Sequence, residues 1–353
     1  MAGIDEAALK TKHSEEVEHL QNIIKERDRE MQVYRKEHGS LQHFFRQLDA
    51  AIEPLEPSRA FYTPSTVATA PCVAVMHTTD GHHGAIQDPE EIEGFGSFSP
   101  EISTARQLGF AEDVVDWVEI HRHGYKIDEL HHLVTGDLIS GDIHDELRIT
   151  NAWPSPVQAI RAGELLAQQI AITAPHFEKV HVHFVVADNH SRLTKKPQAS
   201  EAGLNSMNYV VGYYARALLR NLPNVEFNLY PVHETVVHVA NRQYLICHGA
   251  DVTGWMGMPW YGIQRKVARE SEARLQIIME DLGRAKEVGF HKYVFGHWHV
   301  PIDLPLYMAA GSVSGTTAYD HKQGRHSKPS QSAWMVHSKY AEFDRTNFSL
   351  RDA

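Results

Sequence analysis

Five short motifs in the sequence carry side chains that bind metals or transfer protons. They are Asp80-Gly81-His82, Gly136-Asp137, Asn189-His190, His248-Gly249 and Gly296-His297-Trp298-His299. Each motif stands at the end of a short apolar run of the kind that forms a β-strand. Ligands of open α/β sheets bind beyond the carboxyl ends of the strands, so these side chains are placed to converge on one site.

The spacing of the motifs permits that convergence. Their leading polar residues stand at positions 80, 137, 189, 248 and 297, so neighbouring motifs are 49 to 59 residues apart. Each interval is long enough for a helical crossover that returns the next strand to the same edge of the sheet. We therefore expect five loops to meet at one candidate site.

The chemistry of the site follows from its side chains, which are two carboxylates, one carboxamide and several imidazoles, without sulfur. This set suits manganese, iron or zinc better than a soft metal. Six or seven ligands are too many for one tetrahedral zinc ion, but they suit two metals about 3.5–4 Å apart that share a carboxylate. Such a pair converts a bound water to hydroxide and clamps phosphate oxygens. The pattern therefore predicts hydrolysis of phosphate esters.

The ordered series D-x-H, G-D, N-H, H-G and G-H-x-H resembles the calcineurin-like metallophosphoesterase superfamily over residues 71–320. The resemblance implies an α/β fold of stacked mixed β-sheets flanked by helices. It implies two divalent metal ions, with manganese expected and iron, zinc or magnesium as alternatives. The ligands it implies are Asp80, His82 and His299 for one metal, Asn189, His248 and His297 for the other, and Asp137 as the bridge.

The resemblance also assigns a catalytic role to His190, which would act as an acid at the leaving oxygen. The superfamily usually has glycine before the ligand Asn and an acidic residue after the His, whereas this chain has Asp188 and Ser191. Aspartate tolerates the left-handed conformation of a tight turn better than most residues. We therefore expect the turn to persist and Asp188 to orient His190.

The second motif lacks the Arg-Gly of the phosphoprotein phosphatases, which disfavours that activity. The G-H-x-H-x-P of residues 296–301, followed by Gly311-Ser312, resembles the nuclease branch, and residues 189–197 resemble phage- and prophage-encoded metallophosphoesterases. We expect a phosphodiesterase or nuclease that acts on a phosphate ester such as DNA or RNA. The alternatives are a small-substrate phosphomonoesterase or nucleotide hydrolase, and a non-catalytic interaction protein assembled through its N-terminal helix.

Three residues near the motifs are candidates for binding the substrate. Arg192 and Lys195 belong to the best local basic cluster, which would either hold a phosphate backbone or form a solvated loop face. His83 follows the first motif and is expected to line the pocket. Residues 250–262 form a long aromatic loop that is either a binding lid or a loop packed on itself.

The chain divides into three predicted parts: a coiled-coil-like segment at 1–50, a linker at 51–70 with three prolines, and the catalytic domain at 71–353. Over residues 17–48, eight of ten heptad seam positions are apolar or aromatic. This helix would either lie on the catalytic body or join copies of the chain into a homo-oligomer.

Within the catalytic domain, hydrophobic runs predict strands and longer periodic stretches predict helices. The predicted strands are 71–77, 131–136, 179–187, three within 225–249, and 292–297, with further short strands in the tail. The predicted helices are 101–123, 156–173, 203–220 and 265–288. Early alternation followed by clustered strands indicates an α/β core with a mixed sheet or two stacked sheets.

The composition is that of an ordinary globular protein, with 42% hydrophobic residues among 353 and a net charge of −11. It excludes a disordered, collagen-like or disulfide-stapled chain. No apolar run reaches the ~20 residues of a membrane span, and the first residues do not resemble a signal peptide. The two cysteines lie in apolar runs typical of reduced core thiols. We expect a cytoplasmic protein that does not interact with membranes.

Overall fold

The computed structural model describes residues 22–23, 25–27, 29, 43, 45–56, 70–252 and 258–352. Most of the predicted coiled-coil segment and linker lies outside the described residues, although residues 45–51 form a helix. The chain divides into two compact units, Met1–Glu53 and Pro54–Ala353. All five motifs belong to the second unit, which is the one described below.

The first of two mixed β-sheets carries three of the motifs. It has six strands in the order β11-β10-β1-β2-β3-β4. Their bounds are β1 Pro71–Thr78, β2 Lys126–Val134, β3 Lys179–Val185, β4 Val225–Tyr230, β10 Ser330–His337 and β11 Ala341–Ser349. Strands β1 to β4 are parallel, whereas β10 pairs antiparallel with both β1 and β11. The carboxyl ends of β1, β2 and β3 therefore meet at one edge.

The second sheet has five strands in the order β5-β6-β7-β9-β8. Their bounds are β5 Glu234–Val239, β6 Arg242–Cys247, β7 Lys292–Phe295, β8 Ile302–Leu304 and β9 Tyr307–Ala309. Strands β6, β7 and β9 are parallel, and β5 and β8 run antiparallel to their neighbours. The chain enters this sheet through the β5–β6 hairpin.

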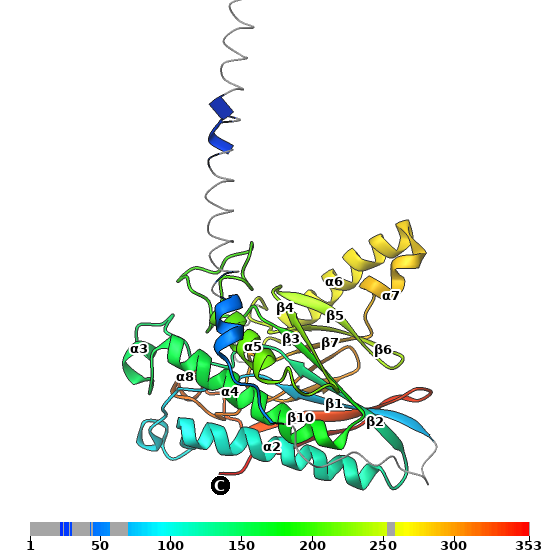
Figure 1. Cartoon of the computed structure of the whole chain (residues 1–353), viewed down its shortest axis with the longest axis horizontal. Helices are drawn as coiled ribbons and strands as arrows, with labels where there is room; N and C mark the ends of the chain where they lie inside the picture. The colour runs from blue at the N-terminus through cyan, green and yellow to red at the C-terminus, as the bar shows by residue number, and fades with distance from the viewer. Residues whose placement is uncertain are drawn as a thin grey trace, which may run out of the picture. The chain divides into compact units, whose positions relative to one another are not determined.

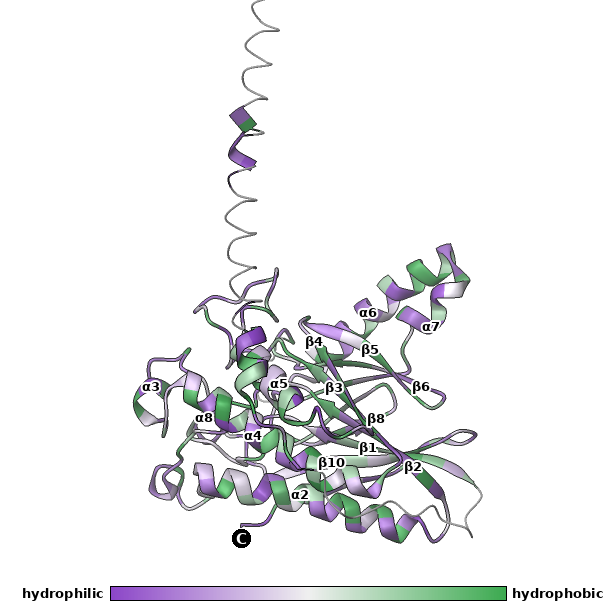
Figure 2. Ribbon diagram, viewed as in Figure 1, coloured by the Kyte–Doolittle hydropathy of each residue, from purple (hydrophilic) through white to green (hydrophobic). Residues whose placement is uncertain are grey.

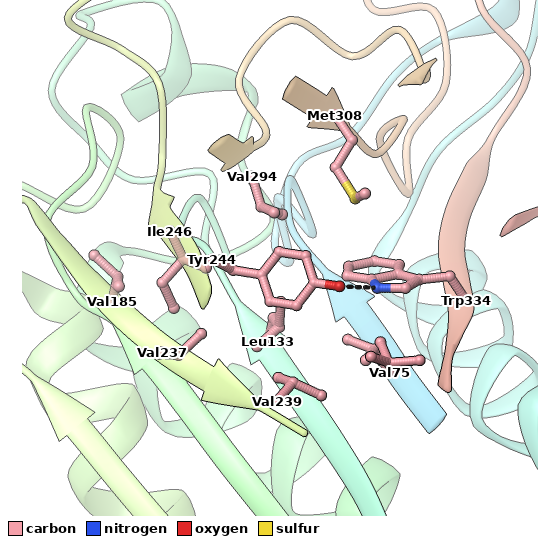
Figure 3. Close-up of a cluster of buried hydrophobic side chains, with 11 residues drawn as sticks. Val75, Leu133, Val185, Val237, Val239, Tyr244, Ile246, Val294, Met308 and Trp334 are labelled. Atoms are coloured by element: carbon pink, nitrogen blue, oxygen red, sulfur yellow. Dashed lines mark hydrogen bonds between the residues drawn. The ribbon is translucent and has the colours of Figure 1, made fainter. Parts of the chain in front are cut away.

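The two sheets pack face to face over a hydrophobic core (Figure 3). Val75 and Leu133 of the first sheet and Tyr244 and Val294 of the second are all fully buried in this layer. The indole N–H of Trp334 donates to the Tyr244 hydroxyl at 3.1 Å, so the polar groups of these two large side chains are hydrogen-bonded to each other. Burying each large apolar side chain contributes about 1.5–3 kcal/mol, which makes this layer a main source of the fold's stability.

Helices flank both sheets (Figures 1 and 2). Helices α2 (Pro100–His121), α4 (Ser155–Thr173) and α5 (Met207–Leu218) lie together against the first sheet, and α6 (Trp260–Glu280) packs on the second. In Figure 2, hydrophobic and hydrophilic residues alternate along α2, as expected for a helix with one buried face. The shorter helical elements are α3 Leu147–Thr150, α7 Ala285–Val288, α8 Ala318–Lys322, η1 Pro89–Ile92, η2 Ala174–His176 and η3 Leu282–Arg284.

Local chemistry explains where one of these helices begins and how another packs. The Ser99 hydroxyl accepts the Ile102 N–H at the start of α2, and Pro100 occupies the first turn, where no N–H is needed. In α5, a Cβ on Gly212 would lie 2.4 Å from Leu229 Cδ1. Glycine at this position therefore lets α5 approach the sheet closely.

The predicted fold class is confirmed: the protein is mixed α/β, with two stacked mixed sheets flanked by helices. Helices α2 and α4 and strands β1, β3 and β7 match the predicted ranges within two residues at each end. The helix predicted at 265–288 begins earlier, at Trp260, and stops at Glu280 before the separate α7. Strand β8 and helix α8 were not predicted. Among the described residues, no helix is long and apolar enough to cross a membrane.

Candidate metal centre

All five motifs follow the carboxyl ends of strands, but the strands belong to two sheets. Asp80, Asp137 and Asn189 follow β1, β2 and β3 of the first sheet, and His248 and His297 follow β6 and β7 of the second. The expectation that helical crossovers return every motif to one sheet edge is therefore wrong. The β5–β6 hairpin carries the chain into the second sheet instead, and the loops converge where the ends of the two sheets meet.

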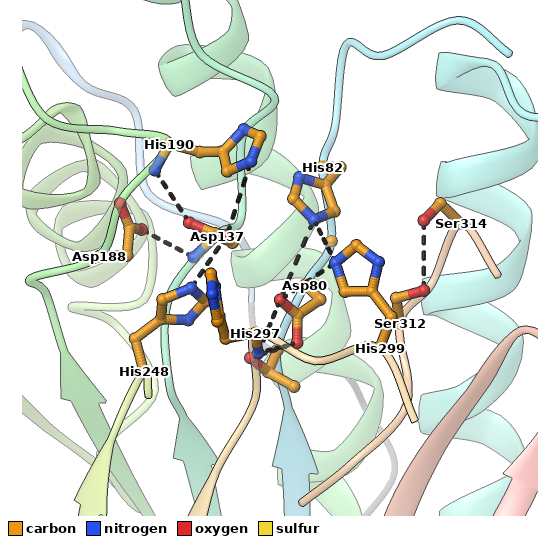
Figure 4. Close-up of polar contacts among 12 residues, drawn as sticks. Asp80, His82, Asp137, Asp188, His190, His248, His297, His299, Ser312 and Ser314 are labelled. Carbon is orange, nitrogen blue, oxygen red and sulfur yellow. Dashed lines mark hydrogen bonds and ion pairs between the residues drawn. The ribbon is translucent and has the colours of Figure 1, made fainter. Parts of the chain in front are cut away.

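One group of ligand atoms comes from Asp80, His82 and His299, which lie within 4.8 Å of one another (Figure 4). The Nε2 atoms of His82 and His299 face each other at 3.1 Å. His299 Nε2 also lies 3.6 Å from Asp80 Oδ1. These three residues are the ones predicted to hold the first metal.

A second group comes from Asp137, His248 and His297, again within 4.8 Å of one another. Asp137 Oδ2 lies 2.9 Å from His248 Nε2. The amide oxygen of Asn189 lies 2.9 Å from the same nitrogen, which brings this residue into the group. These four residues are the predicted ligands of the second metal together with the predicted bridge.

A third group, formed by His82, Asp137 and His190, connects the first two. Asp137 thus lies between the two sets of ligands, as a bridging carboxylate would. The structure brings together the whole predicted set of metal ligands: Asp80, His82, Asp137, Asn189, His248, His297 and His299. We call these residues the metal centre.

The hydrogen bonds of the metal centre fit bound cations. His248 Nδ1 lies 2.8 Å from the Thr135 carbonyl oxygen, so this nitrogen carries a proton and donates it. The other nitrogen, Nε2, faces two oxygen acceptors, from Asp137 and Asn189. His299 is arranged alike, because its Nδ1 donates to Asp320 Oδ2 at 2.7 Å and its Nε2 faces His82. Facing acceptors repel unless a proton or a metal ion lies between them.

Burial and charge shift the pKa values of the centre strongly. Burial lowers the pKa of His248, but the adjacent Asp137 carboxylate outweighs it and raises the pKa to about 10. The His248 charge in turn holds the pKa of Asp137 well below its usual range, against the effect of burial. Burial lowers the pKa of His297 to about 3. Because a metal ion replaces the proton on His248, metal affinity should rise with pH.

The backbone of the metal centre is strained. Five non-glycine residues of the centre have φ between 41° and 69°: Asp80, His82, Asp137, His297 and His299. Such a conformation costs about 1–3 kcal/mol per residue and persists only where the surrounding structure enforces it. Backbone hydrogen bonds between the first two loops do so, including His82 N–H to the Asp137 carbonyl at 2.9 Å. The strain supports a functional interpretation of these loops.

At two positions of the motifs, neighbouring atoms lie so close to the backbone that only glycine fits. A Cβ on Gly296 would lie 2.0 Å from Thr79 Oγ1 and 2.5 Å from Asp80 Oδ2. Because the position has no side chain, the next residue, His297, donates its N–H to the Asp80 carboxylate at 2.9 Å. Gly136 has a φ of +94°, and its Cβ would lie 2.9 Å from Asp188 Cβ. The glycines of the G-H-x-H and G-D motifs are thus explained by packing around the ligands.

The prediction that Asp188 orients His190 is wrong. His190 Nδ1 lies 2.6 Å from the Ser140 carbonyl oxygen, so the backbone of the second motif orients the ring. The Asp188 carboxylate accepts the Asp137 N–H at 2.7 Å and the Ser191 N–H at 2.8 Å. Burial raises its pKa to about 6. Asp188 therefore positions the backbone of the bridging residue.

The three predicted substrate-binding residues lie in different surroundings. The Arg192 guanidinium donates to the carbonyls of Thr194 and Lys195 within its own loop. The Lys195 ammonium pairs with Asp145 at 3.0 Å on the surface. His83 is 3% exposed, and its ring packs near Trp153 beside a cavity of about 280 Å³. Each of these residues thus has contacts of its own in the structure, and their role in substrate binding stays a prediction.

Part of the predicted aromatic lid, residues 253–257, lies outside the described residues. Trp260 and Tyr261 are described and begin helix α6 with 48% and 76% exposure. They therefore belong to a helix and not to a loop, and whether the remaining segment covers a substrate stays a prediction.

Sequence reasoning missed Asp320, which holds the His299 ring. Its signal was a capping box, Thr317-x-x-Asp320, in which Thr317 Oγ1 accepts the Asp320 N–H at 3.1 Å. That signal predicts a helix start but not the partner on a distant loop. Gln331 was also missed. Its side chain accepts the Thr79 N–H at 2.9 Å and donates to the Gly311 carbonyl at 2.7 Å, which ties the end of β1 to the tail.

Comparisons with known proteins give fold likenesses only. No family model and no curated protein sequence matches the chain. Among solved structures, vacuolar protein sorting 29 of Cryptosporidium parvum matches with 13% identity and a TM-score of 0.31, over 79% of this chain and 98% of that one. A predicted phosphoesterase of Streptococcus pneumoniae matches with 10% identity and a TM-score of 0.27, over 80% and 99%. Vacuolar protein sorting 29 of Entamoeba histolytica, complexed with Zn²⁺, matches with 12% identity and a TM-score of 0.27, over 78% and 98%.

Proposed function

We propose that the protein is a metal-dependent phosphoesterase, and more narrowly a phosphodiesterase with nuclease activity. One observation carries the proposal: two sets of three or four metal-ligating atoms meet at the buried carboxylate of Asp137. The residues that would hold one ion are Asp80, His82, Asp137 and His299, and those for the other are Asp137, Asn189, His248 and His297. The oxygen and nitrogen donors favour manganese, iron or zinc.

Two divalent ions would supply positive charge for the phosphate oxygens and a water activated for attack. The chain contributes the rigidity that holds such a reaction centre. Asp80 is completely buried and Asp137 is 1% exposed, and their loops are joined by backbone hydrogen bonds. A dry, fixed environment strengthens every electrostatic interaction with the substrate.

His190 is placed to donate a proton to the leaving oxygen. Its Nδ1–H is committed to the Ser140 carbonyl, so a second proton on the ring sits on Nε2. Nε2 lies 4.0 Å from Asp137 Oδ2, and the His190 side chain is 20% exposed. The protonated ring therefore presents an N–H beside the metal centre, where substrate has access.

The charges near the centre favour a diester over a monoester. A monoester carries up to two negative charges near neutral pH, and a diester carries one. The predicted anion-binding groups, Arg192 and Lys195, are occupied by loop carbonyls and by Asp145. The neutral ligand Asn189 also avoids an additional negative charge beside an incoming phosphate. A diester therefore requires less positive charge from this protein surface than a monoester does.

Substrates with different leaving groups test both the activity and the role of His190. Chelator-stripped protein with added Mn²⁺ should hydrolyse bis(p-nitrophenyl) phosphate faster than p-nitrophenyl phosphate. His190→Ala should reduce hydrolysis of a thymidine dinucleotide by about 10²-fold or more, because its alkoxide leaving group needs a proton. The loss with bis(p-nitrophenyl) phosphate should be smaller, because p-nitrophenolate leaves readily without one.

The matched control is His144→Ala, which removes an exposed ring 6.0 Å from the His190 ring. It should retain activity on both diesters. Turnover of the monoester alone would reject the diesterase assignment, and equal losses on both diesters in His190→Ala would reject the proton-donor role.

A further inference from the structure

A second group of metal-ligating atoms lies away from the metal centre. One atom each from Glu129, His131 and His181 lies within 4.8 Å of the others. Glu129 and His131 belong to β2 and His181 to β3, within the parallel part of the first sheet seen in Figure 1. The group shares no residue with the metal centre, and His131 lies within β2, whereas Asp137 lies beyond the carboxyl end of that strand.

The register of the sheet places these side chains on one face. His131 pairs with His181 across the parallel β2–β3 ladder, and His181 pairs with Glu226 on β4. Side chains that are paired in neighbouring strands project in the same direction. The His131 and His181 rings accordingly stack with centroids 4.7 Å apart. Side chains of three adjacent strands therefore contribute to one small cluster.

Hydrogen bonds behind the rings point their free nitrogens toward the cluster. His131 Nδ1 lies 3.1 Å from His183 Nε2, and His183 Nδ1 lies 3.3 Å from the Tyr230 hydroxyl. A neutral imidazole has one N–H, so when His131 donates through Nδ1 its Nε2 carries a lone pair. That nitrogen faces Glu129 Oε2 at 4.0 Å. This is the usual arrangement of a metal-binding histidine, whose other nitrogen is hydrogen-bonded.

The Glu226 carboxylate contacts the second ring of the cluster, that of His181. Glu226 Oε2 lies 3.2 Å from His181 Nδ1. The imidazole side chains are 8% and 17% exposed, whereas the carboxylate side chains of Glu129 and Glu226 are 45% and 64% exposed. The nitrogens are therefore held rigidly by the sheet, and the carboxylates can move toward an ion that enters from solvent.

We propose that Glu129, His131 and His181 form a second binding site, for a single divalent transition-metal ion, and that Glu226 orients His181 in it. Two imidazoles and a carboxylate match the ligands of zinc, with water as the fourth. The 4.0 Å gap between His131 and Glu129 needs to close only slightly, to the ~3.3 Å between ligands of a tetrahedral site with bonds of about 2.0–2.2 Å. The ion would clamp β2 to β3 and steady the edge strand β4.

Counting bound zinc in the full chain tests this site separately from the metal centre. Chelator-stripped protein is equilibrated with Zn²⁺, and its metal content is measured by plasma mass spectrometry. Glu129→Gln and His181→Gln should each bind one zinc ion fewer than the unmodified protein. His238→Gln, which removes an exposed histidine from β5, is the matched control and should bind as much as the unmodified protein.

Asp137→Asn separates this inference from the proposed function. That variant should lose metal from the centre and still bind one zinc ion, with a zinc-dependent rise in the melting temperature. The rise should disappear in Asp137→Asn combined with Glu129→Gln. Unchanged zinc content in both Glu129→Gln and His181→Gln, or no zinc in Asp137→Asn, would overturn the second site, whatever the activity measurements show.

Discussion

At the scale of single residues, Asp320 determines how His299 faces the metal centre. Its carboxylate accepts the His299 Nδ1–H at 2.7 Å and is held by Thr317 and by Arg325. Burial alone would raise the pKa of Asp320, but the His299 charge and these hydrogen bonds hold it below its usual range. The carboxylate therefore stays ionised and keeps His299 Nε2 turned toward the centre.

Asp320→Asn should weaken metal binding without removing a ligand. A carboxamide lacks the charge that stabilises the histidine as a ligand, and loss of such a partner typically costs 10–100-fold in metal affinity or activity. The Mn²⁺ concentration for half-maximal diester hydrolysis should rise by about that factor. Activity should return when Mn²⁺ is raised further.

Arg325→Gln is the control for this substitution. Arg325 pairs with the other oxygen of Asp320 at 2.8 Å. Its removal disturbs the surroundings of helix α8 but leaves the hydrogen bond between Asp320 and His299. The Mn²⁺ requirement should change less than in Asp320→Asn, and an equal change would show that Asp320 acts only through the stability of α8.

The convergence of the candidate metal ligands could be predicted from the sequence, because each of them belongs to a motif that follows a strand. The residues that orient them could not. Asp320 reaches His299 from 21 positions away along the chain, and Gln331 reaches Thr79 from 252 positions away. Such pairs depend on how two sheets and their loops pack, and no spacing rule connects them. Asp188 likewise kept its place in the site but acts on the backbone of Asp137 and not on His190.

At the scale of elements, tight loops at the strand ends position the candidate ligands, and Gly296 is one of the most tightly packed glycines in those loops. Its missing side chain makes room for Thr79 and Asp80 at the end of β1. The β7 loop and the β1 loop, from different sheets, therefore touch at the metal centre. A side chain at this position would push the two sheets' loops apart.

Gly296→Ala should lower both stability and activity. Overpacking a tight site costs about 1–3 kcal/mol, and displacement of Asp80 should reduce metal binding. Urea unfolding and metal-dependent diester hydrolysis measure the two effects. Gly109→Ala in α2 is the control, because nothing lies within 4 Å of its Cβ and alanine favours a helix by about 0.5–1 kcal/mol. A Gly296→Ala protein with normal activity would contradict the packing argument.

The first sheet and its helices were predictable because strands alternate with long amphipathic helices, a pattern read directly from hydrophobicity. In the second sheet only β8 was not predicted, because its three residues are too few to show a period. Helix α8 has five residues and was recognisable only from its capping box. The predicted oligomerisation helix at 17–48 lies mostly outside the described residues and stays a prediction.

At the scale of the whole molecule, buried histidines link stability to pH. His77 and His132 are fully buried, and each pairs through Nε2 with a threonine hydroxyl at 2.8 Å. Burial lowers the pKa of each ring from 6.5 to about 3. Below pH 6.5 these two rings therefore bind protons in the unfolded chain but stay neutral in the folded protein. The 25 histidines of the sequence therefore include such core positions as well as candidate metal ligands.

The free energy of unfolding should accordingly fall as the pH drops from about 6.5 toward 3. Each of these rings contributes a slope of up to about 1.4 kcal/mol per pH unit. Urea unfolding of metal-free protein at pH 7 and pH 5 measures the slope. His132→Gln should reduce it by that amount, whereas His123→Gln, at an exposed turn, should keep the original slope. Equal slopes in His132→Gln and the unmodified protein would refute this linkage.

The seven converging residues form the proposed metal-dependent phosphoesterase site, with Asp137 as its bridge. The most direct measurement is the rate of bis(p-nitrophenyl) phosphate hydrolysis against Mn²⁺ concentration, for the unmodified protein and for Asp137→Asn. We expect no rate after chelation, a saturable rate with Mn²⁺, and a loss of at least about 10²-fold in Asp137→Asn despite an intact fold. No Mn²⁺-dependent hydrolysis by the unmodified protein, or equal hydrolysis by both proteins, would contradict the account.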